Sequence, residues 1–204
     1  MDLPIELSDA FAWPHSEPRQ CEDTCWALVQ AAQTGSQEAF KQLVERHQSA
    51  IYDFCVRWLG NAEDAREVCQ DTFVRAWEAL PRFEKRARFS TWLYRIALNL
   101  CRDRFKSKAG RQSRATLFLE DGPGEWACSQ PAPDEFASQS GDIEKLHRGI
   151  QALPEFLRSP LLLCCIEGLS HQECAHILKC SSRAVEGRIY RARRELLDWW
   201  NREP

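Results

Sequence analysis

The 204-residue sequence predicts an all-α fold of two small helical domains joined by a flexible linker. Apolar residues recur at spacings of three and four over most of the chain, as they do on the buried side of an amphipathic helix. No segment shows the period-two alternation that is typical of strands. A stretch rich in glycine, proline and serine separates the two helical parts. We therefore expect domains at 25–107 and 143–204, with a linker at 108–142.

The first 24 residues predict a flexible arm, because they contain Pro4, Pro14 and Pro18 and show no sustained period. The N-terminus is acidic and lacks the basic and apolar regions of a secretory signal. No apolar run approaches the roughly 18 residues that a membrane-spanning helix needs. We therefore expect a cytoplasmic protein with no membrane insertion.

Three amphipathic helices are expected in the first domain. The first spans residues 35–59 and ends at Gly60, and the second begins at its cap Asn61 and stops at Pro81. The third begins at its cap Ser90. The residues expected to face inward on the second helix are Ala65, Val68, Cys69, Phe73, Ala76, Trp77 and Leu80.

The second domain is expected to contain an entry helix, a helix around residues 156–166 and then a helix-turn-helix. Ser170 and Glu173 have the spacing of a capping box, which starts a short helix that residues 179–182 break. The next helix has an apolar stripe formed by Val185, Ile189, Ala192 and Leu196.

The side of this last helix opposite the stripe is basic. A helix-turn-helix presents such a face to the major groove of DNA, although a merely solvated basic face is the alternative. The residues on and beside this face are Arg183, Glu186, Gly187, Arg188, Tyr190, Arg191, Arg193 and Arg194.

A second candidate DNA-facing surface lies on the third helix of the first domain. Aromatic and basic side chains on one side suit single-stranded DNA, because arginines bind phosphates and an indole can stack on a base. Alternatively, Trp92 packs under the preceding loop and the charges are solvated. The residues concerned are Trp92, Arg95, Asn99, Arg102 and Lys106.

The preceding helix has an acidic outer side that includes Asp64, Glu67, Asp71 and Glu78. These carboxylates would repel DNA and fit a basic protein partner better, although they could serve solubility alone. The net charge of −3 gives no overall nucleic-acid signal, but two separate basic elements stand in an otherwise acidic chain, which suits contact with an extended polyanion at two places.

Ten cysteines are spread over a chain without an export signal, which favours reduced thiols over a disulfide framework. Cys21 and Cys25, with His15 nearby, could contribute to a zinc or redox site. No paired Cys-x-x-Cys spacing occurs, so we expect neither a metal nor another cofactor. A phosphate loop and a nucleophile elbow are also absent from the sequence, and we expect no enzymatic activity.

Five motifs occur in a fixed order along residues 25–200. They are NAEDAREVCQDTFVRAW (61–77), FSTWLYRIALN (89–99), LPE (153–155), EGLS (167–170) and GRIYRAR (187–193). Together they closely resemble the extracytoplasmic-function (ECF) sigma factors of bacterial RNA polymerase, in the sigma-E-like group. Cys174 and the pair Cys164-Cys165 depart from the residues that such factors usually have there.

The resemblance implies roles for three sets of residues. Core-polymerase docking, on the clamp coiled coil of the β′ subunit, is expected at Asp64, Glu67, Gln70, Asp71 and Phe73. Melting and capture of the −10 element is expected at Lys85, Arg86, Arg88, Trp92, Arg95, Asn99, Arg102 and Lys106. Recognition of the −35 element is expected at Arg183, Glu186, Gly187, Arg188, Tyr190 and Arg191.

The function implied is direction of core RNA polymerase to specific promoters, in a stress, envelope or metal response. The implied partners are the β′ and β subunits, promoter DNA and an anti-sigma factor. The alternative is a two-domain helix-turn-helix regulator that binds duplex DNA without docking on polymerase.

Overall fold

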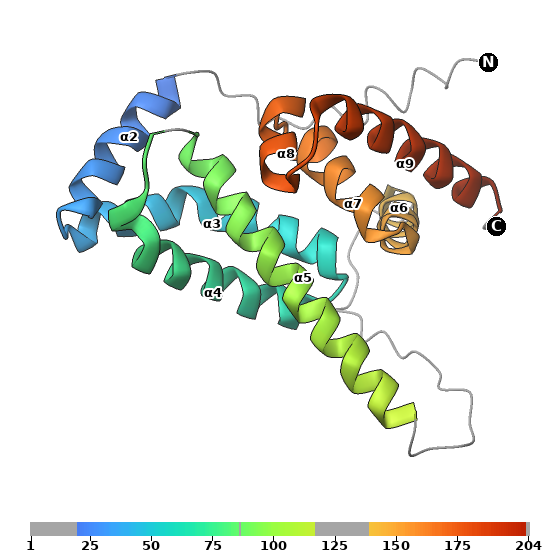
Figure 1. The fold of residues 1–204 in the computed structure, drawn as a ribbon. Helices are drawn as coiled ribbons and strands as arrows, with labels where there is room; N and C mark the ends of the chain where they lie inside the picture. The colour runs from blue at the N-terminus through green and yellow to red at the C-terminus, as the bar shows by residue number, and fades with distance from the viewer. Residues whose placement is uncertain (1–19, 86, 117–138, 203–204) are drawn as a thin grey trace.

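The computed structural model describes residues 20–85, 87–116 and 139–202, and within these ranges it contains helices and no strand (Figure 1). The expected all-α class is therefore confirmed. The N-terminal elements are α2 (Gln20–Gln33), α3 (Gln37–Leu59), α4 (Ala62–Ala79), the 3-10 helix η1 (Leu80–Arg82) and α5 (Phe89–Thr116). The C-terminal elements are α6 (Gln139–Ala152), α7 (Glu155–Leu161), the π-helix η2 (Leu162–Ile166), α8 (His171–Leu178) and α9 (Ser182–Arg202).

The N-terminal bundle is built around α3, which contacts α2, α4 and α5. Ser36 caps α3 by accepting from the Ala39 N–H at 3.2 Å. Gly60 ends the helix with a left-handed backbone (φ 69°), which glycine adopts without steric cost. Asn61 then accepts from the Asp64 N–H at 2.9 Å and starts α4, as its place in the sequence predicts.

Helix boundaries differ from the expectation at both ends of α5 and at the starts of α2 and α6. Helix α5 begins at Phe89, so the expected cap Ser90 lies inside the helix. Helix α2 begins at Gln20, inside the stretch expected to be an arm, while α5 continues to Thr116 and α6 begins at Gln139. Both ends of the expected linker at 108–142 are therefore helical. Residues 108–116 contain one glycine among good helix formers, so helix propensity favours continuation of α5, which projects beyond the bundle (Figure 1). Residues 1–19 and 117–138 lie outside the described ranges.

The helix expected at 156–166 has two parts. Pro154 precedes α7, and Pro160, which has no N–H to donate, lies near its end. The backbone then widens into η2, where the Glu167 N–H donates to the Leu162 carbonyl five residues back at 3.0 Å. This irregular turn brings the chain to the start of the helix-turn-helix.

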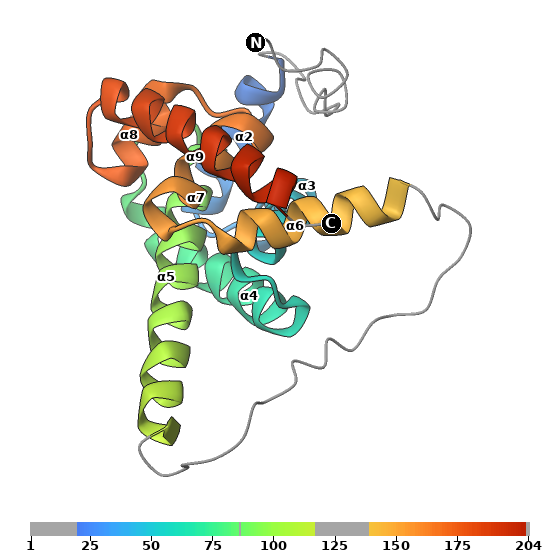
Figure 2. The same ribbon diagram turned by 90° about the vertical axis from the view of Figure 1, so that its right-hand side faces the viewer.

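The two bundles pack against each other, and their buried side chains form one continuous core. Helix α6 and η2 contact α3, and α8 contacts α5 (Figure 2). The buried Trp58 indole N–H donates to Ser159 Oγ across this boundary at 3.1 Å. The chain bends tightly at Gly60 beside Gln151, where an added Cβ would come within 2.9 Å of the Gln151 side chain.

Candidate nucleic-acid and polymerase interfaces

The helix-turn-helix consists of α8 and α9, and its expected capping box is formed. The Glu173 N–H donates to Ser170 Oγ at 3.2 Å, and the Ser170 N–H donates to Glu173 Oε2 at 2.9 Å. Burial opposes ionisation of Glu173, but hydrogen bonds from Ser170 and Thr91 outweigh it and hold the pKa of this carboxyl below its usual range. Lys179 then ends α8 in a left-handed conformation (φ 53°), and Ser181 caps α9 through the Ala184 N–H.

Helix α9 buries its apolar stripe and presents the basic side to solvent. Val185, Ile189 and Ala192 are buried, whereas Tyr190 is 69% exposed. Arg191 donates its Nε to the Gly187 carbonyl one turn back at 3.2 Å. The six predicted −35 residues therefore lie along one accessible helix: Arg183, Glu186, Gly187, Arg188, Tyr190 and Arg191.

Arginine side chains suit the outer side of α9, because the planar guanidinium group can bind guanine edges and phosphates in the major groove. Gly187 adds a gap on this surface, because a Cβ built there would meet nothing within 4 Å. Arg188 is partly buried and donates an Nη1 hydrogen to Cys180 Sγ at 3.7 Å, which links the recognition helix to the turn.

The predicted −10 surface has an aromatic centre. Trp92 is partly buried, and its ring centroid lies 4.7 Å from that of Phe83 and 5.7 Å from that of Phe89. Trp92 thus packs on the loop that precedes α5, which was one of the two alternatives. Lys85 is exposed and lies over the ring of Trp26, with 5.1 Å between Nζ and the ring centroid.

The basic residues of this surface have different environments. Asn99 and Lys106 are exposed, and Arg95 is partly buried. Arg88 and Arg102 both lie near carboxylates of the C-terminal domain. Arg86 lies outside the described residues.

The predicted docking residues on α4 divide into supporting and accessible groups. Asp64 is buried and accepts from Arg104 Nε at 3.0 Å, and Phe73 is 8% exposed. Glu67, Gln70 and Asp71 are exposed. Glu67, Gln70 and Asp71 can therefore contact a partner directly. Asp64 and Phe73 are buried and support α4 from beneath.

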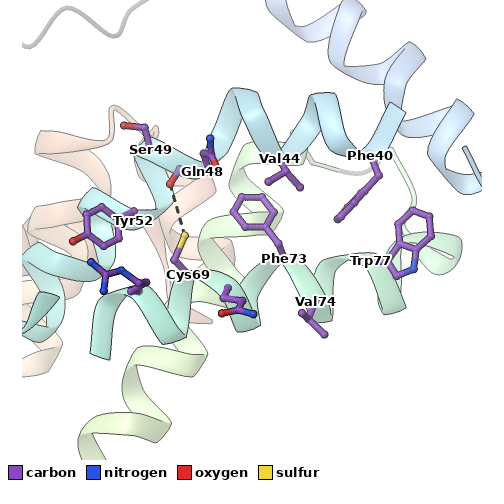
Figure 3. A pocket seen from close by; sticks show the side chains of 11 residues that line it. Phe40, Val44, Gln48, Ser49, Tyr52, Cys69, Phe73, Val74 and Trp77 are labelled. Atoms are coloured by element: carbon purple, nitrogen blue, oxygen red, sulfur yellow. Dashed lines mark hydrogen bonds between the residues drawn. The ribbon is translucent and has the colours of Figure 1, made fainter. Parts of the chain in front are cut away.

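An open apolar groove of about 750 Å³ lies beside these residues, between α3 and α4 (Figure 3). Phe40 and Val44 line it from α3, and Phe73, Val74 and Trp77 line it from α4. The expectation that Trp77 faces the core is wrong in part, because its side chain is 36% exposed and borders this groove. Its ring packs against that of Phe40, with 4.8 Å between the ring centroids.

Val74 was not predicted as a surface feature, although it is an apolar residue outside the expected inward stripe and is 51% exposed. An apolar residue off the stripe is the signal that could have indicated the groove. Contacts between the two domains were also missed, because they join residues about 100 positions apart and follow from no local pattern.

The cysteines whose side chains the structure describes form no disulfide. Burial raises the pKa of the Cys69 thiol to about 11, so it is protonated at neutral pH. No group of three or more metal-ligating side chains occurs in the described ranges. Cys21 and His15 lie outside the side chains described there. The described helices also include none with the length and apolar character to cross a membrane.

Two family models match the chain: Sigma-70 region 2 at residues 43–111 and Sigma-70, region 4 at residues 143–196. The chain is 36% identical to the RNA polymerase sigma-H factor of Pseudomonas aeruginosa, over 81% of this chain and 88% of that protein. It is 32% identical to the ECF RNA polymerase sigma-E factor of Escherichia coli, again over 81% and 88%. The solved structure of CnrH in complex with the cytosolic domain of CnrY matches with a TM-score of 0.67 and 31% identity, covering 89% of this chain and 100% of that one.

The two matched regions correspond to the two helical bundles, in the order that the sequence motifs predict. The chain belongs to the family of ECF RNA polymerase sigma factors.

Proposed function

We propose that this chain binds core RNA polymerase and directs it to promoters that have a −35 and a −10 element, without catalysis of its own. The observation that supports this function best is the presence of two basic surfaces on two separate domains. The outer side of α9 suits duplex DNA, and the aromatic and basic side of α5 suits an opened strand.

The −10 surface includes Arg95, Asn99 and Lys106, which can follow the phosphates of one strand. Trp92, which packs against the buried rings of Phe83 and Phe89 and is itself only partly buried, offers ring surface beside them on which an unpaired base can stack. Unstacking a base costs a few kcal/mol, which such stacking and the phosphate contacts offset. These residues therefore act once the duplex begins to open.

The docking surface is proposed to be the exposed side of α4, with Glu67, Gln70 and Asp71 in contact with the clamp coiled coil of the β′ subunit. The acidic side chains favour a basic partner and would keep DNA away from this side. Val74 and Trp77 add apolar area next to them. The protein would act in the cytoplasm, where β and β′ are assembled.

An anti-sigma factor is a further proposed partner. The related sigma factor CnrH has been solved in complex with the cytosolic domain of CnrY, which supports a protein inhibitor of the same kind for this chain. Release from such an inhibitor would link the promoters of this factor to a stress, envelope or metal signal.

The function is tested by incubating the purified chain with core polymerase and fragmented genomic DNA of its source, then mapping the RNA 5′ ends. The proposal predicts a small set of start sites that share upstream sequence elements and require the chain. Absence of both core binding and initiation would exclude it. Tight binding to duplex DNA as a symmetric dimer without core would instead favour the two-domain regulator.

A further inference from the structure

Two cysteines that depart from the residues usual in ECF sigma factors come together in the C-terminal domain. Cys164 lies in η2 and Cys174 in α8, and their side chains are hydrogen-bonded to each other. The Leu169 N–H donates to the Leu163 carbonyl at 3.0 Å, which turns the chain back between the two elements. Two thiols at hydrogen-bond distance need only a small movement to form a disulfide. Cys164 and Cys174 are called the C-terminal dithiol below.

A second thiol pair in the described part of the chain shows what access contributes. Cys55 and Cys101 are also hydrogen-bonded, but both are 0% exposed in the N-terminal core. In the C-terminal dithiol, Cys174 is likewise 0% exposed, whereas Cys164 is partly exposed. A small oxidant can therefore approach Cys164 in the folded protein, while the Cys55 and Cys101 pair is closed to it.

The contact also makes the two thiols of the C-terminal dithiol chemically unequal. The hydrogen bond with Cys174 lowers the pKa of the Cys164 thiol, although burial opposes ionisation. The same contact and burial raise the pKa of Cys174. Because the thiolate is the nucleophile, Cys164 reacts first and Cys174 is the resolving thiol.

The neighbouring sulfur atoms have other partners. Cys165 Sγ accepts from Arg193 Nη2 at 3.4 Å, and Cys180 Sγ accepts from Arg188 Nη1 at 3.7 Å. Both arginines belong to α9, so these two sulfur atoms are engaged with the recognition helix. The thiols of the C-terminal dithiol are left to react with each other.

We propose that the C-terminal dithiol is a redox site, which a small hydroperoxide converts to a Cys164–Cys174 disulfide. The Cys164 thiolate attacks the terminal peroxide oxygen, so an S–O bond forms and the O–O bond breaks. The departing alkoxide or hydroxide takes a proton from water. The Cys174 thiol then attacks the resulting sulfenic acid, so the S–S bond forms, the S–O bond breaks and water leaves with the Cys174 proton. The two thiols thus supply the two electrons that reduce the peroxide, and a thiol reductant reverses the reaction.

The disulfide would close a loop that contains the capping box of Ser170 and Glu173. Helix α8, which carries one of the two sulfur atoms, contacts α9. Oxidation therefore ties the support of the recognition helix to the turn before it. The proposed −35 residues on the outer side of α9 remain chemically unchanged.

The test exposes the reduced full chain to hydrogen peroxide and then blocks the remaining thiols with iodoacetamide. Cleavage after Lys, Arg and Glu places the cysteines concerned in the separate peptides 159–167, 174–179 and 180–183. Mass spectrometry of wild type is expected to find 159–167 joined to 174–179, and dithiothreitol should separate them. This link should form at least about tenfold faster than one between Cys55 and Cys101, because thiol oxidation follows access.

Single changes identify the reacting sulfur. Cys165→Ser is the matched control, since it removes the adjacent, partly exposed thiol, and it should form the link at the wild-type rate. Cys164→Ser should lose the link. In Cys174→Ala, Cys164 should stop at the sulfenic acid, which the 1,3-diketone dimedone traps. Circular dichroism melting verifies that the variants stay folded.

Persistence of the link in Cys164→Ser, or its loss in Cys165→Ser, would overturn the assignment to Cys164. Absence of the link in wild type, at peroxide concentrations that oxidise an unstructured cysteine peptide, would overturn the redox site itself. Equal oxidation rates for the two thiol pairs would contradict the role of access. These readouts need neither polymerase nor promoter DNA, so failure of this proposal is distinguishable from failure of the proposed function.

Discussion

Gly187 lies on the exposed side of α9, where a side chain would meet no other part of the protein. Glycine costs about 1 kcal/mol relative to alanine inside a helix, so Gly187→Ala should raise the stability of the C-terminal domain by up to about 1 kcal/mol. The same change should weaken use of the −35 element, because the added methyl group lies where DNA would come close. Thermal melting and transcription in vitro measure the two effects.

Gly141→Ala is the matched control for this prediction. Gly141 also lies in a helix with nothing within 4 Å of a Cβ, but on α6, away from the proposed DNA surfaces. It should stabilise the protein and leave transcription unchanged. Unchanged transcription from Gly187→Ala as well would show that DNA does not approach α9 at this residue.

His47 is a partly buried group whose ionisation opposes folding. Its ring lies 5.5 Å from that of Phe89, and burial, assisted by the charge of Arg46, lowers the pKa of His47 to about 4. Between this value and the unfolded value of 6.5 the unfolded chain binds more protons, so stability rises with pH in that window. The contribution is complete above 6.5 and is lost as the pH falls toward 4.

His47→Gln, which cannot titrate, should therefore reduce the pH dependence of the free energy of unfolding. Between about pH 7 and pH 5 the wild type should lose at most about 2 kcal/mol more than the variant. Urea titrations at both pH values measure this difference. Equal losses in the two proteins would mean that His47 titrates normally in the folded state.

Helices α4 and α9 are proposed to have separable tasks, which two single changes can test. Asp71→Ala should weaken core binding by about 1–2 kcal/mol, or roughly five- to thirtyfold, with little effect on duplex binding. Arg191→Ala should weaken promoter binding by the holoenzyme and lower its salt dependence by about one phosphate contact, with core affinity unchanged.

Both variants have close controls. Arg202 lies on the same helix as Arg191, and its Nε–H likewise donates to the carbonyl four residues back, at 3.0 Å. Arg202→Ala therefore tests whether the loss of promoter binding depends on where the arginine lies along α9. Glu45 on α3 is likewise exposed and acidic, so Glu45→Ala is the control for Asp71→Ala. If Asp71→Ala binds core as tightly as Glu45→Ala does, the docking surface is not on α4.

Across the whole molecule, the features that depend on residues adjacent in the sequence could be predicted from the sequence. The Asn61 cap, the Ser170 and Glu173 capping box and the buried stripe of α9 each depend on a few adjacent positions. The class of fold and the placement of the proposed DNA-binding residues on α5 and α9 follow from such rules.

Features set by tertiary contacts could not be predicted in this way. Arg158 lies within an apolar run, and its partner is the Trp58 carbonyl 100 positions earlier, a pairing that no periodicity indicates. The exposure of Trp77 depends on how far α3 extends over the end of α4. Helix periodicity indicates which side of a helix faces inward but not how far a neighbouring helix extends. The pairing of Arg88 with Glu173 and of Arg102 with Glu155 likewise could not be predicted, because it depends on how the two domains dock.

Footprinting on one of the mapped promoters tests most directly the claim that two surfaces on two domains read DNA together. With core polymerase, the chain should protect the −35 and −10 elements, and bases near −10 should become reactive to a single-strand probe. The chain alone should protect neither element. Protection of one duplex site by the chain alone, unchanged by core and without single-strand reactivity, would contradict this account.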